Sequence, residues 1–172
     1  MMLDESGYKI NHIELRLYDG VILELHKVSN RLGAESILLR DASLLVNYGT
    51  IIINKNTYIT LGFPWEINPN SPPEIMINEG FIHIKGSSNT SSGISLSASE
   101  FINKGSIIFE QGTLLIGLKT IEDSESIFIN DGEISFDARS ELYIERGELI
   151  NNGLLTNKGK QNVGVHGSLV NN

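Results

Sequence analysis

The sequence predicts an all-β fold, a single-stranded parallel β-solenoid (β-helix) of about six to seven coils. One short phrase recurs along the chain: two apolar residues, Asn, any residue, Gly, any residue, and Ile or Leu. The residues after each glycine alternate in hydrophobicity, which is the period of a half-buried strand. The phrases are 31, 25, 27 and 21 residues apart, and self-similarity at about 20–50 residues is typical of solenoids. Their asparagines are Asn47, Asn78, Asn103, Asn130 and Asn151.

Each of these asparagines is followed two positions later by a glycine, and we expect the pair to form a corner. Glycine adopts the positive φ that a sharp turn needs, and Asn tolerates the left-handed region. Asparagines stacked at one corner of successive coils can also donate and accept along a ladder. An antiparallel sandwich with Asn-x-Gly turns is the alternative, but its turns would not recur so regularly. The glycines are Gly49, Gly80, Gly105, Gly132 and Gly153.

Residues 1–11 are polar and are expected to form an N-terminal cap or loose end, with the solenoid over 12–172. Asp19-Gly20 then separates two alternating runs, which is usually a hairpin signal. A two-residue hairpin turn would pair Leu15 with Glu24 and mix apolar and charged residues on one face. We therefore predict a bend between two inward-facing sets. The inward residues are Ile13, Leu15, Leu17, Val21, Leu23 and Leu25.

Residues 62–73 hold all four prolines and the single tryptophan, Trp65. Proline cannot donate to a central ladder, so this Pro-rich segment is predicted to be an inserted, protruding loop. Exposed rings such as Phe63 and Trp65 can stack on sugars or anchor an interface. The alternative is that the loop folds back and covers the solenoid. Residues predicted to face inward after the loop are Ile94, Leu96, Ala98, Leu114, Ile116, Leu118, Leu142 and Ile144.

The composition excludes several classes of partner and cofactor. The net charge is −8 and Lys and Arg do not cluster, so neither nucleic acid nor an anionic membrane is an expected partner. The chain has no cysteine, which excludes disulfides and thiolate sites. No apolar run is long enough for membrane insertion, and the first residues lack a signal peptide. We expect a soluble chain, and its localisation stays open among virion, cell-surface and cytoskeletal assemblies.

No catalytic or metal site is predicted. The histidines at positions 12, 26, 83 and 166 show no ligand spacing, and His83 falls at an outward position of the repeat. Carboxylates could form an acidic face like that of β-helix polysaccharide lyases and hydrolases, but a solvated surface is the simpler interpretation. Sequence alone does not give the separation that a catalytic pair needs. These carboxylates are Glu133, Asp137, Glu141 and Glu145.

The Ile-Asn-x-Gly-x-Ile repeats from Asn47 to Asn171 resemble those of filamentous-haemagglutinin-type and autotransporter-type adhesins. They are also similar to repeats of β-helical viral and phage fibre proteins. This resemblance implies a right-handed parallel β-helix with a structural or adhesive role and no catalytic residues. The chain is far shorter than the adhesins. A polymerising cytoskeletal β-helix of the bactofilin type fits its size better, although the coils here are longer and more irregular.

The expected function is that of a structural, self-assembling protein that forms part of a fibre, filament or shell. The sequence ends with a copy of the phrase, so Leu169, Val170 and Asn171 form a final coil whose edge can pair with a homo-oligomeric partner. The rival is that this end frays and the rods associate side by side. A glycan- or host-surface-binding module is the alternative function, and a polysaccharide-acting enzyme is a weaker one.

Overall fold

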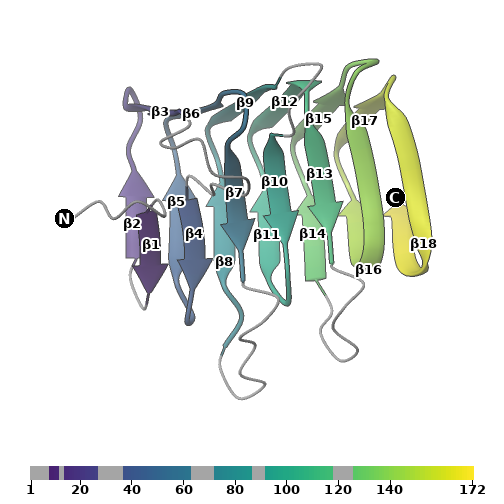
Figure 1. The fold of residues 1–172 in the computed structure, drawn as a ribbon, viewed down its shortest axis with the longest axis horizontal. Helices are drawn as coiled ribbons and strands as arrows, with labels where there is room; N and C mark the ends of the chain where they lie inside the picture. Colours follow the sequence, from purple (N-terminus) through teal and green to yellow (C-terminus); the bar gives the residue numbers. More distant parts are fainter. Residues whose placement is uncertain (1–7, 12–13, 27–36, 63–71, 87–91, 118–125) are drawn as a thin grey trace.

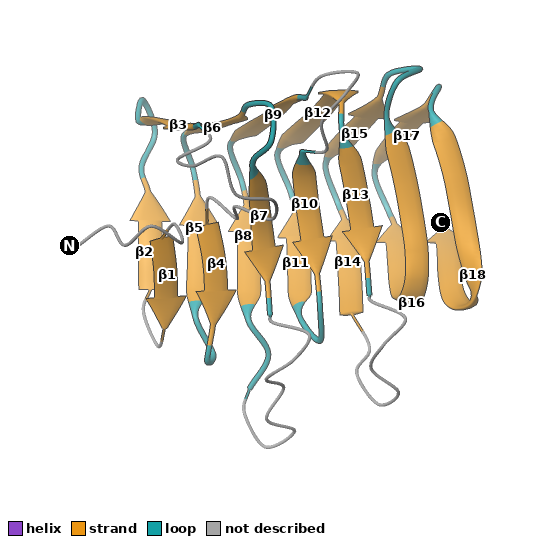
Figure 2. Ribbon diagram, in the orientation of Figure 1, coloured by secondary structure: helices purple, strands orange, loops and turns teal. Residues whose placement is uncertain are grey.

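The structure is a computed structural model that describes residues 8–11, 14–26, 37–62, 72–86, 92–117 and 126–172. Within these ranges every regular element is a β-strand, and there are eighteen of them (Figure 2). The prediction of an all-β fold is confirmed.

Most strands pair with the strand three places later in the chain, so three consecutive strands make one layer and equivalent strands form three rows (Figure 1). The first row holds β1 (Tyr8–Asn11), β4 (Ile37–Arg40), β7 (Tyr58–Leu61), β10 (Gly93–Leu96) and β13 (Thr113–Ile116). The second row holds β2 (Glu14–Leu17), β5 (Leu44–Asn47), β8 (Ile75–Asn78), β11 (Glu100–Asn103) and β14 (Ser126–Asn130). The third row holds β3 (Ile22–Leu25), β6 (Thr50–Ile53), β9 (Phe81–Lys85), β12 (Ser106–Gln111), β15 (Glu133–Phe136) and β17 (Leu154–Asn157).

The long strand β16 (Glu141–Asn151) joins the first two rows into one sheet. Its first half pairs with β13 and its second half with β14. The last strand, β18 (Lys160–Asn171), pairs along both halves of β16. The third row forms a separate six-stranded sheet.

All strand pairs among the described residues are parallel. An antiparallel sandwich is therefore wrong, and the chain has the strongly curled parallel arrangement of a β-solenoid. Tyr8–Asn11, assigned from sequence to a cap or loose end, pairs with β4 in this arrangement.

The core lies between the three rows, where equivalent residues of successive layers stack. The half-buried alternation predicted after each motif glycine is confirmed: Ile51, Ile82, Ile107 and Ile134, each two residues after such a glycine, are aligned in one column and at most 1% exposed. Leu155 continues the column and is partly buried. Two phenylalanine pairs pack at centroid distances of 4.6 Å (Phe101–Phe128) and 4.5 Å (Phe109–Phe136), which is within the range of favourable ring contacts.

The bend at Asp19-Gly20 is also confirmed. β2 pairs with β5 and β3 with β6, so the two strands belong to different sheets and form no hairpin. Gly20 has a φ of 79°, which a residue without Cβ adopts readily. Leu17 and Leu25 are buried, as expected.

Two residues predicted to face inward do not. Val21 is 43% exposed because it belongs to the bend that precedes β3, where the strand alternation has not yet begun. Ala98 has a φ of 51° at the corner after β10, and its neighbours Ser97 and Ser99 are buried instead. Ile13 and Leu118 lie outside the described residues. The other predicted inward residues after the loop are buried: Ile94, Leu96, Leu114, Ile116, Leu142 and Ile144.

Candidate functional site

The corner between the second and third rows holds a continuous ladder of buried asparagine side chains. Each second-row strand from β5 onward ends in Asn, and these residues are aligned by the strand register. In every step the Nδ2 amide of one asparagine donates to the Oδ1 atom of the next. The steps are Asn47 to Asn78 (2.7 Å), Asn78 to Asn103 (2.7 Å), Asn103 to Asn130 (2.7 Å), Asn130 to Asn151 (2.6 Å) and Asn151 to Asn171 (2.5 Å).

The same side chains also bond to the backbone of the corner. The Asn130 amide lies 3.3 Å from the Gly132 carbonyl in its own layer and 3.3 Å from the Leu154 carbonyl in the next. Asn47 accepts from the Gly49 N–H at 3.1 Å. Buried polar groups are tolerated when their hydrogen bonds are made. The prediction that Asn103 and Asn130 are buried and bonded at the corner is confirmed, since both are 0% exposed.

The reason for the motif glycines differs from the prediction. None of the five has a positive φ, and neither do the asparagines. Glycine is required because the layers touch here: a Cβ on Gly105 would lie 2.1 Å from the Gly80 carbonyl oxygen, and one on Gly132 would lie 2.1 Å from that of Gly105. Close backbone approach is the second general use of glycine. The neighbouring coil therefore excludes a side chain at this position.

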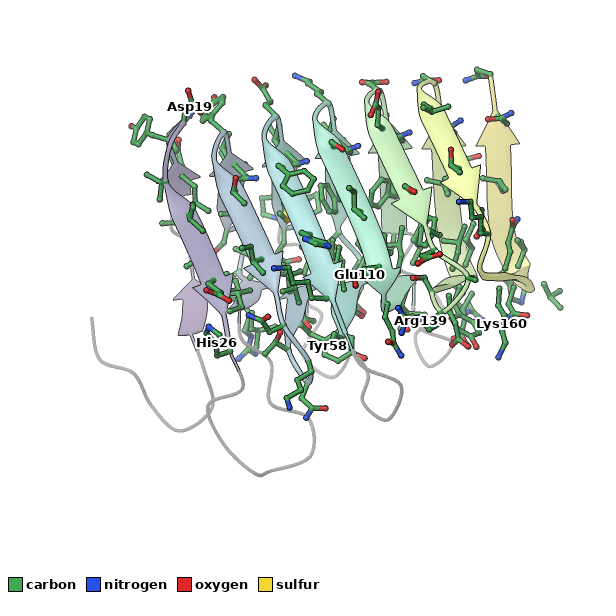
Figure 3. The ribbon with its side chains drawn as sticks, turned by 90° about the horizontal axis from the view of Figure 1, so that it is seen from above. Asp19, His26, Tyr58, Glu110, Arg139 and Lys160 are labelled. Carbon is green, nitrogen blue, oxygen red and sulfur yellow. The ribbon has the colours of Figure 1, made fainter. Side chains whose placement is uncertain are left out.

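A second, exposed column lines the outside of this corner. The Lys104 ammonium lies 3.3 Å from Glu79, the Asn152 amide donates to Asp131 at 2.8 Å, and the Asn172 amide donates to Asn152 at 2.6 Å. Figure 3 shows the side chains of the described residues seen from above, with Asp19 labelled at one end of the row of corners. Exposed pairs of this kind stabilise a fold by only about 0–1 kcal/mol, so the buried ladder is the stronger constraint.

The layer formed by β18 has one neighbour. Within the described residues β18 pairs only with β16, and the Asn171 amide nitrogen donates to no group. Leu169 packs against the core above Leu149. Val163, aligned with the core residue Ile144, is 45% exposed, and Val170 is 38% exposed. The site residues predicted for assembly thus lie on an open sheet edge.

The first layer departs from the ladder. Leu17 of β2 stands at the position that Asn47 occupies in β5. The corner of this layer therefore offers an apolar side chain instead of an amide acceptor.

The predicted binding residues Phe63 and Trp65 lie outside the described residues, as does most of the 62–73 loop. Two of the acidic candidates lie in different rows: Glu133 begins β15 in the third row, whereas Glu141 begins β16 in the first and contacts Lys160 at 3.2 Å. Within the described ranges no group of three His, Asp or Glu side chains could hold a metal ion.

The described surface has a shallow recess with no carboxylate among its lining residues, which are His26, Asn54, Lys55, Lys85 and Gly86.

His83 lies on the outer side of β9. Its Nε2 atom is 3.2 Å from Glu110, and its ring contacts Phe81. This environment is that of a surface histidine.

Glu74 is a half-buried carboxylate that the sequence did not indicate. It precedes β8 at the corner between the first and second rows, where equivalent positions hold Ser43 and Ser99. Burial raises the pKa of the Glu74 carboxyl, against the opposing effect of the backbone N–H groups of Asp41 and Ala42, which donate to it. Asp41 and Ala42 both have positive φ, so this carboxylate caps a left-handed corner formed by distant residues. No local motif marks such a cap.

Comparison with protein-family models, with curated proteins and with solved structures finds no match. In the part of the chain that the structure describes, no helix is long and apolar enough to cross a membrane.

We predict that Asn130→Leu lowers the free energy of unfolding by about 1–3 kcal/mol, because it leaves buried ladder and backbone groups unpaired. Urea denaturation followed by circular dichroism measures this change. Asn152→Leu is the matched control, since Asn152 is exposed on the outer column of the same corner. Equal losses in the two variants would show that the buried ladder does not hold the corner.

We predict a pH-dependent effect at Glu74. Because its pKa is raised in the folded chain, its contribution to stability is present below its ordinary value of 4.5 and is lost as pH rises through the raised value. Glu74→Gln removes this loss, so the variant should gain stability relative to the native chain as pH rises above about 4.5. Urea midpoints between pH 4 and 8 test it, with Glu133→Gln as the control for losing one exposed charge. A difference that is constant across this range would contradict the assignment.

Proposed function

We propose that this chain is a structural, self-assembling β-solenoid of about six to seven coils, a right-handed β-helix that forms part of a fibre, filament or shell. The proposal extends the parallel β arrangement to the fibre-forming solenoids that its repeats resemble. It assigns the chain no catalytic role. The inserted loop over 62–73 is proposed to leave the rod rather than interrupt its rows.

The observation that carries the proposal is the open edge of β18. In the interior of a sheet, the backbone N–H and C=O groups of each strand form hydrogen bonds with the strand of the next layer. Among the described residues, β18 has no strand on its second side. An unpaired strand edge is a template for another chain. Two apolar side chains of this layer, Val163 and Leu169, are aligned with core residues. Covering this layer would remove them further from water.

We propose that the cover is a second copy stacked head to tail, because every described layer before that of β18 already accepts a parallel successor. The junction differs from an internal contact in one respect: Leu17 of the incoming copy would meet Asn171, so no amide-to-amide bond forms there. The junction should therefore be weaker than the contacts between layers of one chain, and assembly should be reversible and depend on concentration.

Analytical ultracentrifugation of the 172-residue chain at two concentrations tests this proposal. We predict species larger than a dimer whose mean mass grows with concentration. Val163→Lys with Leu169→Lys should remove this growth and keep the β-sheet circular dichroism, because charges on core positions of the open layer oppose stacking. Val165→Lys is the matched control, since Val165 lies in the same strand but is 96% exposed.

A mass that does not change with concentration, or a double-lysine variant that assembles as well as the native chain, would contradict end stacking. A second variant, Leu17→Asn, tests the same contact by strengthening it and leaves β18 unchanged. It supplies the missing acceptor for Asn171 of the neighbouring copy and should promote growth at lower concentration.

A further inference from the structure

The outer side of the second row carries a stripe of aliphatic side chains. In β8, β11, β14 and β16 the residue before the ladder asparagine points away from the core, because it lies between two buried positions, and Val170 is its aligned equivalent in β18. The register aligns these residues from layer to layer. We call them the outer stripe: Ile77, Ile102, Ile129, Ile150 and Val170.

The stripe is specific to this row. The equivalent outward positions of the third row are mixed: Glu24, Ile52, His83, Ile108, Ser135 and Thr156. Those of the first row are also mixed: Leu38, Thr60, Ser95, Leu115, Tyr143 and Asn162. Strand propensity alone would favour β-branched residues in all three rows, so it does not account for an aliphatic residue in every layer of one row from β5 onward. In the first layer of this row, β2 has Arg16 at the equivalent position.

The stripe is accessible. Its four isoleucines are partly exposed and Val170 is 38% exposed. Ile127, on the flank of the stripe, adds a further 36% exposed aliphatic side chain. Val46 would extend the stripe by one layer but is only 3% exposed. Parallel sheets are normally covered on both faces, and a contiguous exposed apolar surface marks an interaction site.

The two flanks of the stripe carry opposite charges in one layer. Glu100 lies two residues before Ile102, and Lys104 lies two residues after it. Consider two copies related by a two-fold axis parallel to the stacking direction. Their stripes face each other, and the flank that precedes the stripe in one copy lies opposite the flank that follows it in the other. Glu100 of each copy would then face Lys104 of the other, twice in the pair. In the layers of Ile77, Ile129 and Ile150 this operation sets an acidic side chain opposite a neutral one, as for Ile75 and Glu79, and in the layer of Val170 both flanks are neutral.

Two copies running in opposite directions keep each flank opposite itself, so the charges that meet depend on the register. Centred on Ile102 or on Ile129, this arrangement sets like charges against each other, which suppresses that pairing. Centred between these two layers, which are adjacent, it sets Lys104 of each copy opposite Asp131 of the other. A second copy therefore offers a charge partner for Lys104 in both orientations: Glu100 in the parallel one and Asp131 in the opposite one.

We propose that the outer stripe is a lateral interface between two copies of this chain, packed side by side. A second copy offers the same layer spacing of about 4.8 Å, so the β-branched side chains of the two stripes interdigitate as they do between paired sheets. The interface is separate from the β18 end. It goes beyond end stacking and does not require it.

The test uses the Val163→Lys, Leu169→Lys chain, in which end stacking is blocked, and measures its dimer dissociation constant by analytical ultracentrifugation. Ile102→Lys with Ile129→Lys should weaken the dimer more than about tenfold, because it places unpaired charges in an apolar contact. Ile52→Lys with Ile108→Lys makes the same changes at outward positions of the third row and should leave the dimer intact. Urea denaturation checks that both variants stay folded.

Charge reversal tests the orientation. In the parallel dimer Glu100→Lys weakens association, and adding Lys104→Glu restores it, because the two flanks again carry opposite charges. In the opposite orientation Glu100→Lys alone would strengthen the dimer or leave it unchanged, and Asp131→Lys would weaken it, so the two variants together identify the orientation. A monomer in the end-blocked chain, or equal weakening by the stripe and third-row variants, would overturn the lateral interface while leaving end stacking intact.

Discussion

The contact between successive layers at the asparagine corner is the constraint on which the rest of the structure depends. There the backbone of one layer approaches the next so closely that only glycine fits, with a Cβ on Gly132 lying 2.1 Å from the Gly105 carbonyl oxygen. The adjacent asparagines join the layers through their amides at 2.5–2.7 Å. A shift of one residue in any layer would break the ladder and turn core residues outward. The corner thus fixes the register that stacks Ile82 on Ile107 and Phe101 on Phe128.

The same register explains both proposed contacts. Because each second-row strand from β5 onward ends in the same phrase, its three residues have fixed directions: the first faces the core, the second faces out and the asparagine faces the corner. The second residues form the outer stripe, and the asparagines form a ladder whose last amide, on Asn171, is free within the described chain. The repeat that aligns the core residues of successive layers therefore also aligns the outward residues on the surface. Regular surfaces of this kind suit assembly from identical copies.

Much of this arrangement could be predicted from sequence because it is local and repeated. The phrase spacing gave the parallel rows, and the alternation after each glycine identified the inward isoleucines. The failures lie where contacts between coils or corner geometry decide. Gly105 is needed because of its neighbour in another layer, which no local rule describes. Val21 and Ala98 lie at corners where alternation does not hold, and Glu74 is capped by Asp41 and Ala42 from a distant segment. The proposed binding residues Phe63 and Trp65 fall outside the described residues.

Hydrogen exchange of the asparagine side-chain amides, followed by NMR, tests the central role of the corner most directly. If the buried ladder holds the layers together, the Nδ2 protons of Asn103 and Asn130 exchange only when the chain unfolds globally. Those of Asn152, on the exposed column of the same corner, exchange fast. Exchange of Asn130 at the rate of Asn152 in the folded protein would contradict the account, since the ladder would then open without loss of the fold.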